Sequence, residues 1–267
     1  MRWSDEAEAA VKKVPLFVRK RVRARVEKDA LEHGKRRITI AEVKATQARF
    51  LKKQGHDVKG YQIDRCFGAS GCPNRAVVSN GMIKKIKKLF EDADVYGFLK
   101  QTVAGDLKFH HEFRVSLADC PNACSQPQIK DVGIIGAALP RVTDIDCSHC
   151  EACVDACREQ AVLLAENADG PQIDTGRCLA CGRCMAVCPT GTLETGVSGY
   201  RVQLGGKLGR HPRLARELPG IFTEAQVLEV IRACISLYKE KSRNGTRFAE
   251  ILSGPDFDAL ARTFAGR

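Results

Sequence analysis

The organisation of this chain is decided by two stretches, CSHCEACVDAC (147–157) and CLACGRCMAVCP (178–189). Each places four cysteines at the same spacing, C-x2-C-x2-C-x3-C. The cysteines are Cys147, Cys150, Cys153 and Cys157, then Cys178, Cys181, Cys184 and Cys188. Three thiolates on one short loop can reach three corners of a cubane cluster, and a fourth must close the site from elsewhere. The spacing therefore predicts two [4Fe–4S] clusters.

The fourth ligand of each cluster is expected from the other repeat, as in two-cluster ferredoxins. One predicted set is Cys147, Cys150, Cys153 and Cys188, and the other is Cys178, Cys181, Cys184 and Cys157. The alternative is zinc held by paired C-x2-C knuckles, which do not usually need three close cysteines and a fourth three residues on. The first repeat departs from the pattern in one place, because Arg158 follows its last cysteine where Pro189 follows the second.

Composition indicates a globular protein that uses its thiols as metal ligands. The chain has 267 residues, thirteen of them cysteine, with no apolar run long enough to span a bilayer and no secretory signal at its start. We therefore expect a cytoplasmic protein without a membrane span. That compartment keeps thiols reduced, so metal ligands are expected in place of disulfides.

The net charge of +11 admits nucleic acid, an acidic protein or an anionic ligand as partner. The basic run of residues 19–25 lies on a predicted helix whose other face is apolar, and no nucleic-acid motif accompanies it. We expect no nucleic-acid partner. A solvated face, or a dock for an acidic electron donor, is the better interpretation.

A third set of four cysteines is divided between CFGASGCPN (66–74) and CPNAC (120–124). The set is Cys66, Cys72, Cys120 and Cys124, and two loops would bring it together as a four-thiolate site. Cys234, the thirteenth cysteine, falls on an apolar helical face and is predicted to be a core residue.

These two loops, with DVGIIG (131–136), resemble the sulfite and nitrite reductase haemoprotein family, and most closely its short, ferredoxin-bearing members. The resemblance covers roughly residues 60–265. It implies that the four cysteines hold one further cubane and that Cys124 also bridges to a sirohaem iron. The implied cofactors are three [4Fe–4S] clusters and sirohaem. The implied activity is reduction of sulfite, or of nitrite, with electrons relayed through the two ferredoxin-type clusters from a donor protein or redox subunit.

Residues 3–54 resemble a small helical domain that also occurs at the C-terminus of a light-independent protochlorophyllide reductase subunit. The resemblance is carried by Trp3, by the residues around Pro15 to Arg19, and by the run from Glu27 to Thr39. The predicted fold is α+β: a helical domain (1–55), a sulfite-reductase-like domain (60–142 and 195–267) and an inserted ferredoxin module (143–194).

Local patterns predict several elements within these domains. Capping boxes at Thr39–Glu42 and Thr223–Gln226 open two helices, and the first is expected to stop before Gly55. Ser79 is a candidate N-cap for a helix over 82–90. Strands are predicted at 113–117, 132–137 and 200–204.

A small oxyanion substrate needs cations around it, and Lys207, Arg210 and Arg114 are the predicted catalytic residues. Lys207 and Arg210 lie in a glycine-rich stretch (205–212), where backbone and ligand can approach closely. For any single one of the three, a solvated surface role is the competing interpretation.

Full-length members of the family build the haem pocket from two related halves, and this chain shows one cysteine-bearing half. We therefore expect that a second subunit, identical or different, completes the pocket. The alternative function is a non-catalytic [4Fe–4S] electron-transfer subunit without sirohaem.

Overall fold

The computed structural model describes residues 1–264, except the side chains of residues 51–57. The chain divides into two compact units. The first comprises Met1–Val58 together with Gly105–Phe109, and the second contains the rest of the chain. A mixed helix-and-sheet fold was predicted, and the structure confirms it.

The first unit is built from the helices α1 (Asp5–Lys12), α2 (Leu16–Glu32) and α3 (Ile40–Asp57), joined by the short parallel strands β1 (Arg2–Trp3) and β2 (Arg37–Ile38). Ala7, Val26, Ala30 and Ile38 form its core.

The predicted capping box opens α3, because the Thr39 hydroxyl and the Glu42 carboxylate satisfy each other's backbone N–H groups. The predicted stop before Gly55 is wrong, since α3 continues through this residue to Asp57. One glycine costs a helix only about 1 kcal/mol relative to alanine. The helix ends at Asp57 because the next residue, Val58, has an extended backbone.

The second unit is organised around a five-stranded sheet with the order β3-β4-β5-β8-β9. Its strands are β3 (Tyr61–Arg65), β4 (Phe113–Ala118), β5 (Val132–Val142), β8 (Leu193–Leu204) and β9 (Arg216–Glu217). Strands β3, β4 and β5 are parallel neighbours, while β8 is antiparallel to both β5 and β9. All three predicted strands are present. All three are longer than predicted, β4 by one residue. β5 and β8 are much longer because they pair along their whole lengths, from Val132 opposite Leu204 to Val142 opposite Leu193.

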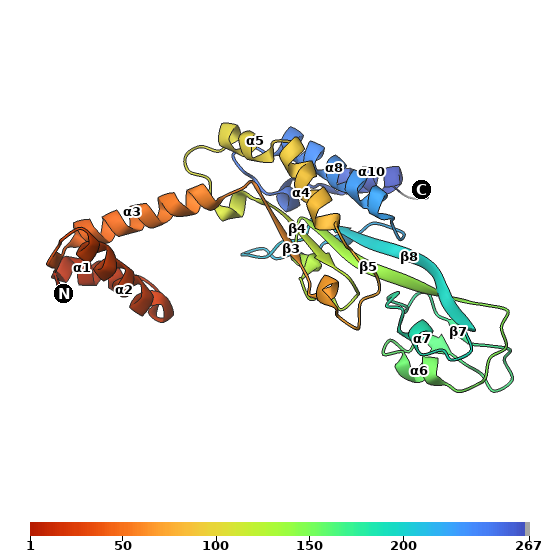
Figure 1. The fold of residues 1–267 in the computed structure, drawn as a ribbon. Helices are drawn as coiled ribbons and strands as arrows, with labels where there is room; N and C mark the ends of the chain where they lie inside the picture. Colours follow the sequence, from red (N-terminus) through yellow and green to blue (C-terminus); the bar gives the residue numbers. More distant parts are fainter. Residues whose placement is uncertain (265–267) are drawn as a thin grey trace. The chain divides into compact units, whose positions relative to one another are not determined.

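Helices α4 (Met82–Asp92), α5 (Val95–Thr102), α8 (Glu224–Lys241) and α10 (Gly254–Phe264) lie together along one side of this sheet (Figure 1). The short α9 (Phe248–Ile251) precedes α10. Aromatic rings join these layers, with Phe113 of β4 contacting Phe90, Tyr238 and Phe248 at centroid distances of 5.3, 5.3 and 5.0 Å. Cys234 of α8 is fully buried, as predicted. Among the described residues, no helix has the length and apolarity required to cross a bilayer.

Ser79 does not cap α4, so that prediction is wrong. The helix begins at Met82 after Gly81, whose φ is +82°. The buried Ser79 hydroxyl instead donates a hydrogen bond to the carboxylate of Asp119, 2.5 Å away. This long-range partner was not visible in the local pattern.

The chain between β5 and β8 forms the cysteine-rich insert. It contains α6 (Ala152–Ala156), α7 (Arg183–Ala186) and the antiparallel pair β6 (Val162–Leu163) and β7 (Gln172–Ile173). Figure 1 shows these elements at the far ends of β5 and β8. The insert is also fastened to the middle of β5, where the Ala138 N–H donates to the Ala180 carbonyl at 2.7 Å.

The second predicted capping box, at Thr223, is confirmed and gives a test of the local fold. Thr223 Oγ1 accepts from the Gln226 N–H at 3.3 Å, and the Thr223 N–H donates to Gln226 Oε1 at 2.7 Å. We expect Thr223→Ala to lower the free energy of unfolding by about 1 kcal/mol in urea titrations. Thr263→Ala, which removes an exposed hydroxyl within α10, is the control. Equal effects of the two substitutions would contradict the capping role.

Candidate iron–sulfur site

Strand pairing brings together the first cysteine of each loop of the third set, Cys66 and Cys120. Cys66 directly follows β3, and Cys120 lies two residues beyond β4. Because β3 and β4 are parallel neighbours, their carboxyl ends meet at the same edge of the sheet, where ligands of open α/β sheets commonly bind. The Cys66 N–H donates to the Leu117 carbonyl at 2.9 Å, which extends the pairing up to the cysteine.

Asp119 joins the two cysteine loops. Its N–H donates to Cys66 Sγ at 3.2 Å, and its Oδ1 accepts the Ser79 hydroxyl. A Cβ at position 68 would lie 2.5 Å from Asp119 Oδ2, so glycine is needed there for the loops to approach this closely. Asp119 Oδ2 is itself buried and has no hydrogen-bond partner among the described residues.

The two loops and part of the insert line an open cavity of about 460 Å³. All four cysteines of the set line it, and so do Cys157 and Cys181 of the insert. Its other polar lining residues include Asn74, Arg75, Asn122, Arg158, Glu159 and Arg183. Thiols from two predicted cluster sites therefore line the same cavity, together with residues that carry amide and guanidinium groups.

The environment of these thiols fits a cationic cluster. Burial raises the pKa of Cys120, and the nearby thiols of Cys124, Cys66 and Cys72 raise it further. Four adjacent thiolates are therefore unfavourable by themselves, and bound iron supplies the positive charge that stabilises them. Hydrogen bonds to sulfur are already in place, from the Gly68 N–H to Cys66 at 3.2 Å and from Asn122 Nδ2 to Cys124 at 3.0 Å.

The eight cysteines of the insert line two further cavities. One cavity is lined by Cys147, Cys150, Cys153 and Cys188, and the other by Cys157, Cys178, Cys181 and Cys184. Each group thus contains three cysteines of one repeat and the last cysteine of the other.

Cys184 and Cys188 have pKa values shifted in opposite directions. Burial raises the pKa of Cys184 to about 11. Burial also acts to raise the pKa of Cys188, but hydrogen bonds from Leu193, Thr190 and Gly191 outweigh it and lower the value to about 7. Cys188 is therefore disposed to be a thiolate, which is the ligand form.

Among the side chains that the structure describes, no three or more of His, Cys, Asp or Glu are arranged to hold a single metal ion. In a [4Fe–4S] cluster each thiolate binds a different iron, so the four sulfur atoms surround a larger group than one ion.

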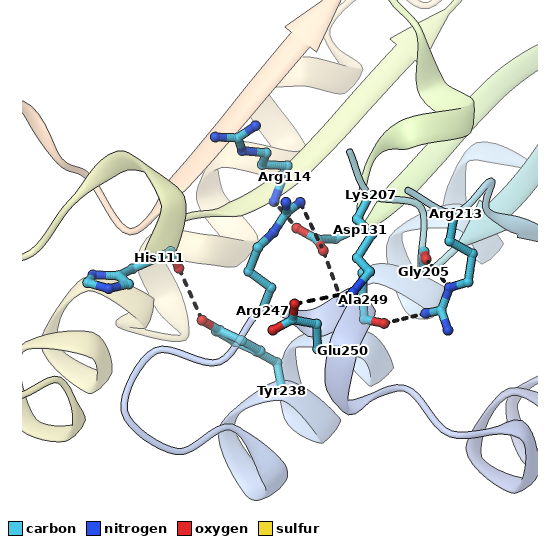
Figure 2. Close-up of polar contacts among 10 residues, drawn as sticks. All are labelled: His111, Arg114, Asp131, Gly205, Lys207, Arg213, Tyr238, Arg247, Ala249 and Glu250. Carbon is cyan, nitrogen blue, oxygen red and sulfur yellow. Dashed lines mark hydrogen bonds and ion pairs between the residues drawn. The ribbon is translucent and has the colours of Figure 1, made fainter. Parts of the chain in front are cut away.

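The structure does not place the predicted catalytic residues Lys207 and Arg114 at the four-cysteine cavity. Figure 2 shows the Lys207 ammonium directed at the Glu250 carboxylate, 3.2 Å away. Arg114 is the second residue of β4, about 13 Å along the strand from its cysteine-bearing end. Arg210 is exposed in the loop after β8 and is not among the described lining residues either. The predicted catalytic role of these three residues stays a prediction.

Sequence reasoning did not assign Arg158 and Arg183 to the cavity. The sequence shows that Arg158 replaces the proline expected after Cys157. Its place in the lining of this cavity depends on how the insert folds against β5.

A match to a protein-family profile identifies the family of this chain. Residues 66–263 match the profile of the nitrite and sulphite reductase 4Fe-4S domain. The chain belongs to this family. Residues 3–47 match a second profile, that of the proto-chlorophyllide reductase 57 kD subunit. The family resemblance read from the cysteine loops is confirmed, and the chain is a sulfite-reductase-like iron–sulfur protein.

Two curated relatives of this family cover about half of the chain. The coenzyme F420-dependent sulfite reductase of Methanocaldococcus jannaschii is 29% identical over 141 residues, which are 52% of this chain and 21% of that protein. A subunit of the anaerobic sulfite reductase of Salmonella typhimurium is 31% identical over 137 residues, which are 50% of this chain and 34% of that protein. The matched region thus spans about a third or less of the length of these relatives.

A solved structure of dissimilatory sulfite reductase I has the same fold over a wide region. It covers 82% of this chain and 57% of the solved chain, with a TM-score of 0.51 and 17% sequence identity. At this identity the similarity concerns the fold alone.

Proposed function

We propose that this chain is the iron–sulfur component of a sirohaem-dependent reductase acting on sulfite or, alternatively, nitrite. The proposed ligands of the haem-coupled cluster are Cys66, Cys72, Cys120 and Cys124, and the insert cysteines hold two relay clusters. When bound, these groups supply one-electron storage and transfer for a multi-electron reduction. Family membership supports the proposal, as do the sulfite reductases among the relatives.

The shared cavity is the observation that carries this proposal. Thiols of the third set and two thiols of the insert, Cys157 and Cys181, line the same space. A redox group held by Cys66, Cys72, Cys120 and Cys124 would therefore adjoin the cysteines of one insert site. This adjacency favours electron transfer between the two sites without a partner protein in between.

Differences in exposure within the third set favour Cys124 as the bridging ligand. Cys120 is buried and Cys66 and Cys72 are partly buried, whereas Cys124 is exposed. An exposed thiolate can bind a cluster iron and still contact a second group from the cavity side. The Asn122 amide, which donates to Cys124 Sγ, would orient that thiolate.

The proposed partners are an electron-donor protein or redox subunits and a small oxyanion. A second subunit, identical or different, is proposed to complete the haem pocket. The positions of Lys207 and Arg114 favour the second candidate function, a non-catalytic electron-transfer subunit, because the cations predicted to hold the oxyanion lie away from the four-cysteine cavity.

Anaerobic purification from a host with intact sirohaem synthesis tests the proposal. We expect about one sirohaem and roughly twelve to thirteen iron atoms per chain, with a tetrapyrrole band in the visible spectrum. Cys124→Ser should disturb the cluster and the tetrapyrrole signals together. Full cluster iron without tetrapyrrole would refute the reductase and leave the electron-transfer subunit.

A further inference from the structure

Asp119 is a buried carboxylate beside the third set of cysteines. It directly precedes Cys120, and 2% of its surface is exposed. One hydrogen bond orients its side chain, because Oδ1 accepts the hydroxyl of the buried Ser79 at 2.5 Å. Oδ2 is also buried and accepts no hydrogen bond from the described residues. Asp119 forms no ion pair within the described part of the chain, so its negative charge has only a neutral partner.

Backbone contacts fix this carboxylate close to Cys66. The Asp119 N–H donates to Cys66 Sγ at 3.2 Å, and the Asp119 carbonyl accepts the N–H groups of Ala76 and Val77 at 2.8 and 3.2 Å. A carboxylate oxygen lies within about 5 Å of its own backbone nitrogen, so the charge lies within about 8 Å of this sulfur. Gly68, whose N–H also donates to Cys66 Sγ, packs against the carboxylate from the other side.

The position of this charge is specific to the third set. Glu112, Asp119 and Asp131 are the buried carboxylates among the described residues, and of these Asp119 alone adjoins a cysteine in the sequence. Glu112 and Asp131 both accept backbone N–H groups. The buried polar side chain that lines an insert site is the neutral Thr192. A buried charge with so little compensation is costly, and it acts strongly on any charged group nearby.

Provided that Cys66, Cys72, Cys120 and Cys124 hold one cluster, as the proposed function requires, we infer that the Asp119 carboxylate lowers the reduction potential of that cluster. On reduction the cluster accepts one electron from a donor, so [4Fe–4S]²⁺ becomes [4Fe–4S]⁺ and its net charge becomes more negative by one. A fixed negative charge in surroundings of low dielectric constant repels the added electron. The oxidised cluster is therefore favoured, and the reduced cluster is a stronger electron donor to a group in the cavity.

The Ser79 hydroxyl acts in the opposite direction to the carboxylate. By donating to Oδ1 it stabilises and partly offsets the negative charge. Loss of the charge and loss of the hydroxyl should consequently shift the potential in opposite directions. A general disturbance of the cysteine loops has no reason to produce this pair of opposite shifts.

The test compares Asp119→Asn and Ser79→Ala in the full-length, cluster-loaded protein from a host without sirohaem synthesis. The asparagine amide keeps the size of the side chain and an oxygen that accepts the Ser79 hydroxyl, but has no charge. Asp92→Asn is the control, because Asp92 is an exposed carboxylate of α4 paired with Lys88. Anaerobic redox titration with dithionite is followed by low-temperature EPR. The signal that Cys120→Ala removes identifies the third cluster, and iron analysis shows whether each variant keeps it.

At a fixed applied potential, we expect the ratio of reduced to oxidised third cluster to rise about tenfold in Asp119→Asn, which is a shift of about 59 mV to higher potential. Ser79→Ala should shift the potential to a lower value, and the control should leave it unchanged. An Asp119→Asn potential that does not rise, or a Ser79→Ala potential that does not fall, overturns the inference. If Asp119→Asn loses its cluster, the Ser79→Ala shift decides alone.

Failure of the proposed function has a different signature. Wild-type protein with about eight iron atoms, and no EPR signal that depends on Cys120, would show that the third set holds no cluster. The cluster assignment and the role of Asp119 would then both be wrong. A wild-type third cluster whose potential does not respond to the two substitutions refutes the role of Asp119 and leaves the proposed function standing.

Discussion

Replacing Cys188 by alanine is expected to lower the iron content by about four atoms per chain and to remove the cluster of the first repeat. The reason is that Cys188 lines the cavity of Cys147, Cys150 and Cys153, and not the cavity of its own repeat. Iron analysis and Mössbauer spectroscopy of the anaerobically purified variant measure the loss. Cys234→Ala is the control, because this buried thiol lies in the α8 core and should leave the iron unchanged.

Double variants distinguish crossed from uncrossed ligation. Cys147→Ala/Cys188→Ala should lose no more iron than Cys188→Ala, since both cysteines serve one cluster. Cys178→Ala/Cys188→Ala should lose about eight atoms, because two clusters are affected. The reverse pattern, with the larger loss in the Cys147 pair, would show that each repeat holds its own cluster.

Asp131→Ala is expected to destabilise the second unit by about 3–5 kcal/mol. Asp131 is fully buried, and its carboxylate accepts the Arg114 N–H at 2.8 Å and the Ala249 N–H at 3.1 Å. The Arg247 guanidinium lies 3.7 Å away (Figure 2). Burial raises the pKa of Asp131, while Arg247 and the two backbone donors act in the opposite direction. Removal of the carboxylate leaves these donors and a mostly buried cation without their acceptor.

The effect is measured as the midpoint of thermal unfolding by circular dichroism at one scan rate, under anaerobic conditions. For a unit of this size we expect the midpoint to fall by roughly 10 °C. Asp258→Ala is the control, because its ion pair with Arg216 is half exposed and should contribute at most about 1 kcal/mol. Equal shifts for the two variants would show that the buried carboxylate is not a structural centre of this unit.

Local sequence signals predicted local structure well in this chain. The capping boxes at Thr39 and Thr223 open helices because the groups that satisfy each other are three residues apart. The strand around Val115 follows from alternation over a few residues. Ser79 was assigned wrongly by the same kind of reasoning, since its partner Asp119 is forty residues away and no short-range rule includes it.

The sequence by itself determined that this chain belongs to the nitrite and sulphite reductase family. It also predicted that the cysteines are cluster ligands, because thiol spacing within a loop fixes which corners of a cluster that loop can reach. Only the tertiary structure decided which loops meet. The parallel pairing of β3 and β4 brings Cys66 to Cys120, and the folding of the insert against β5 places Arg158 and Arg183 in the lining of the same cavity. It also separated Lys207 and Arg114 from that cavity. These placements depend on contacts between distant segments, whose free energy comes from burial and pairing that no local pattern encodes.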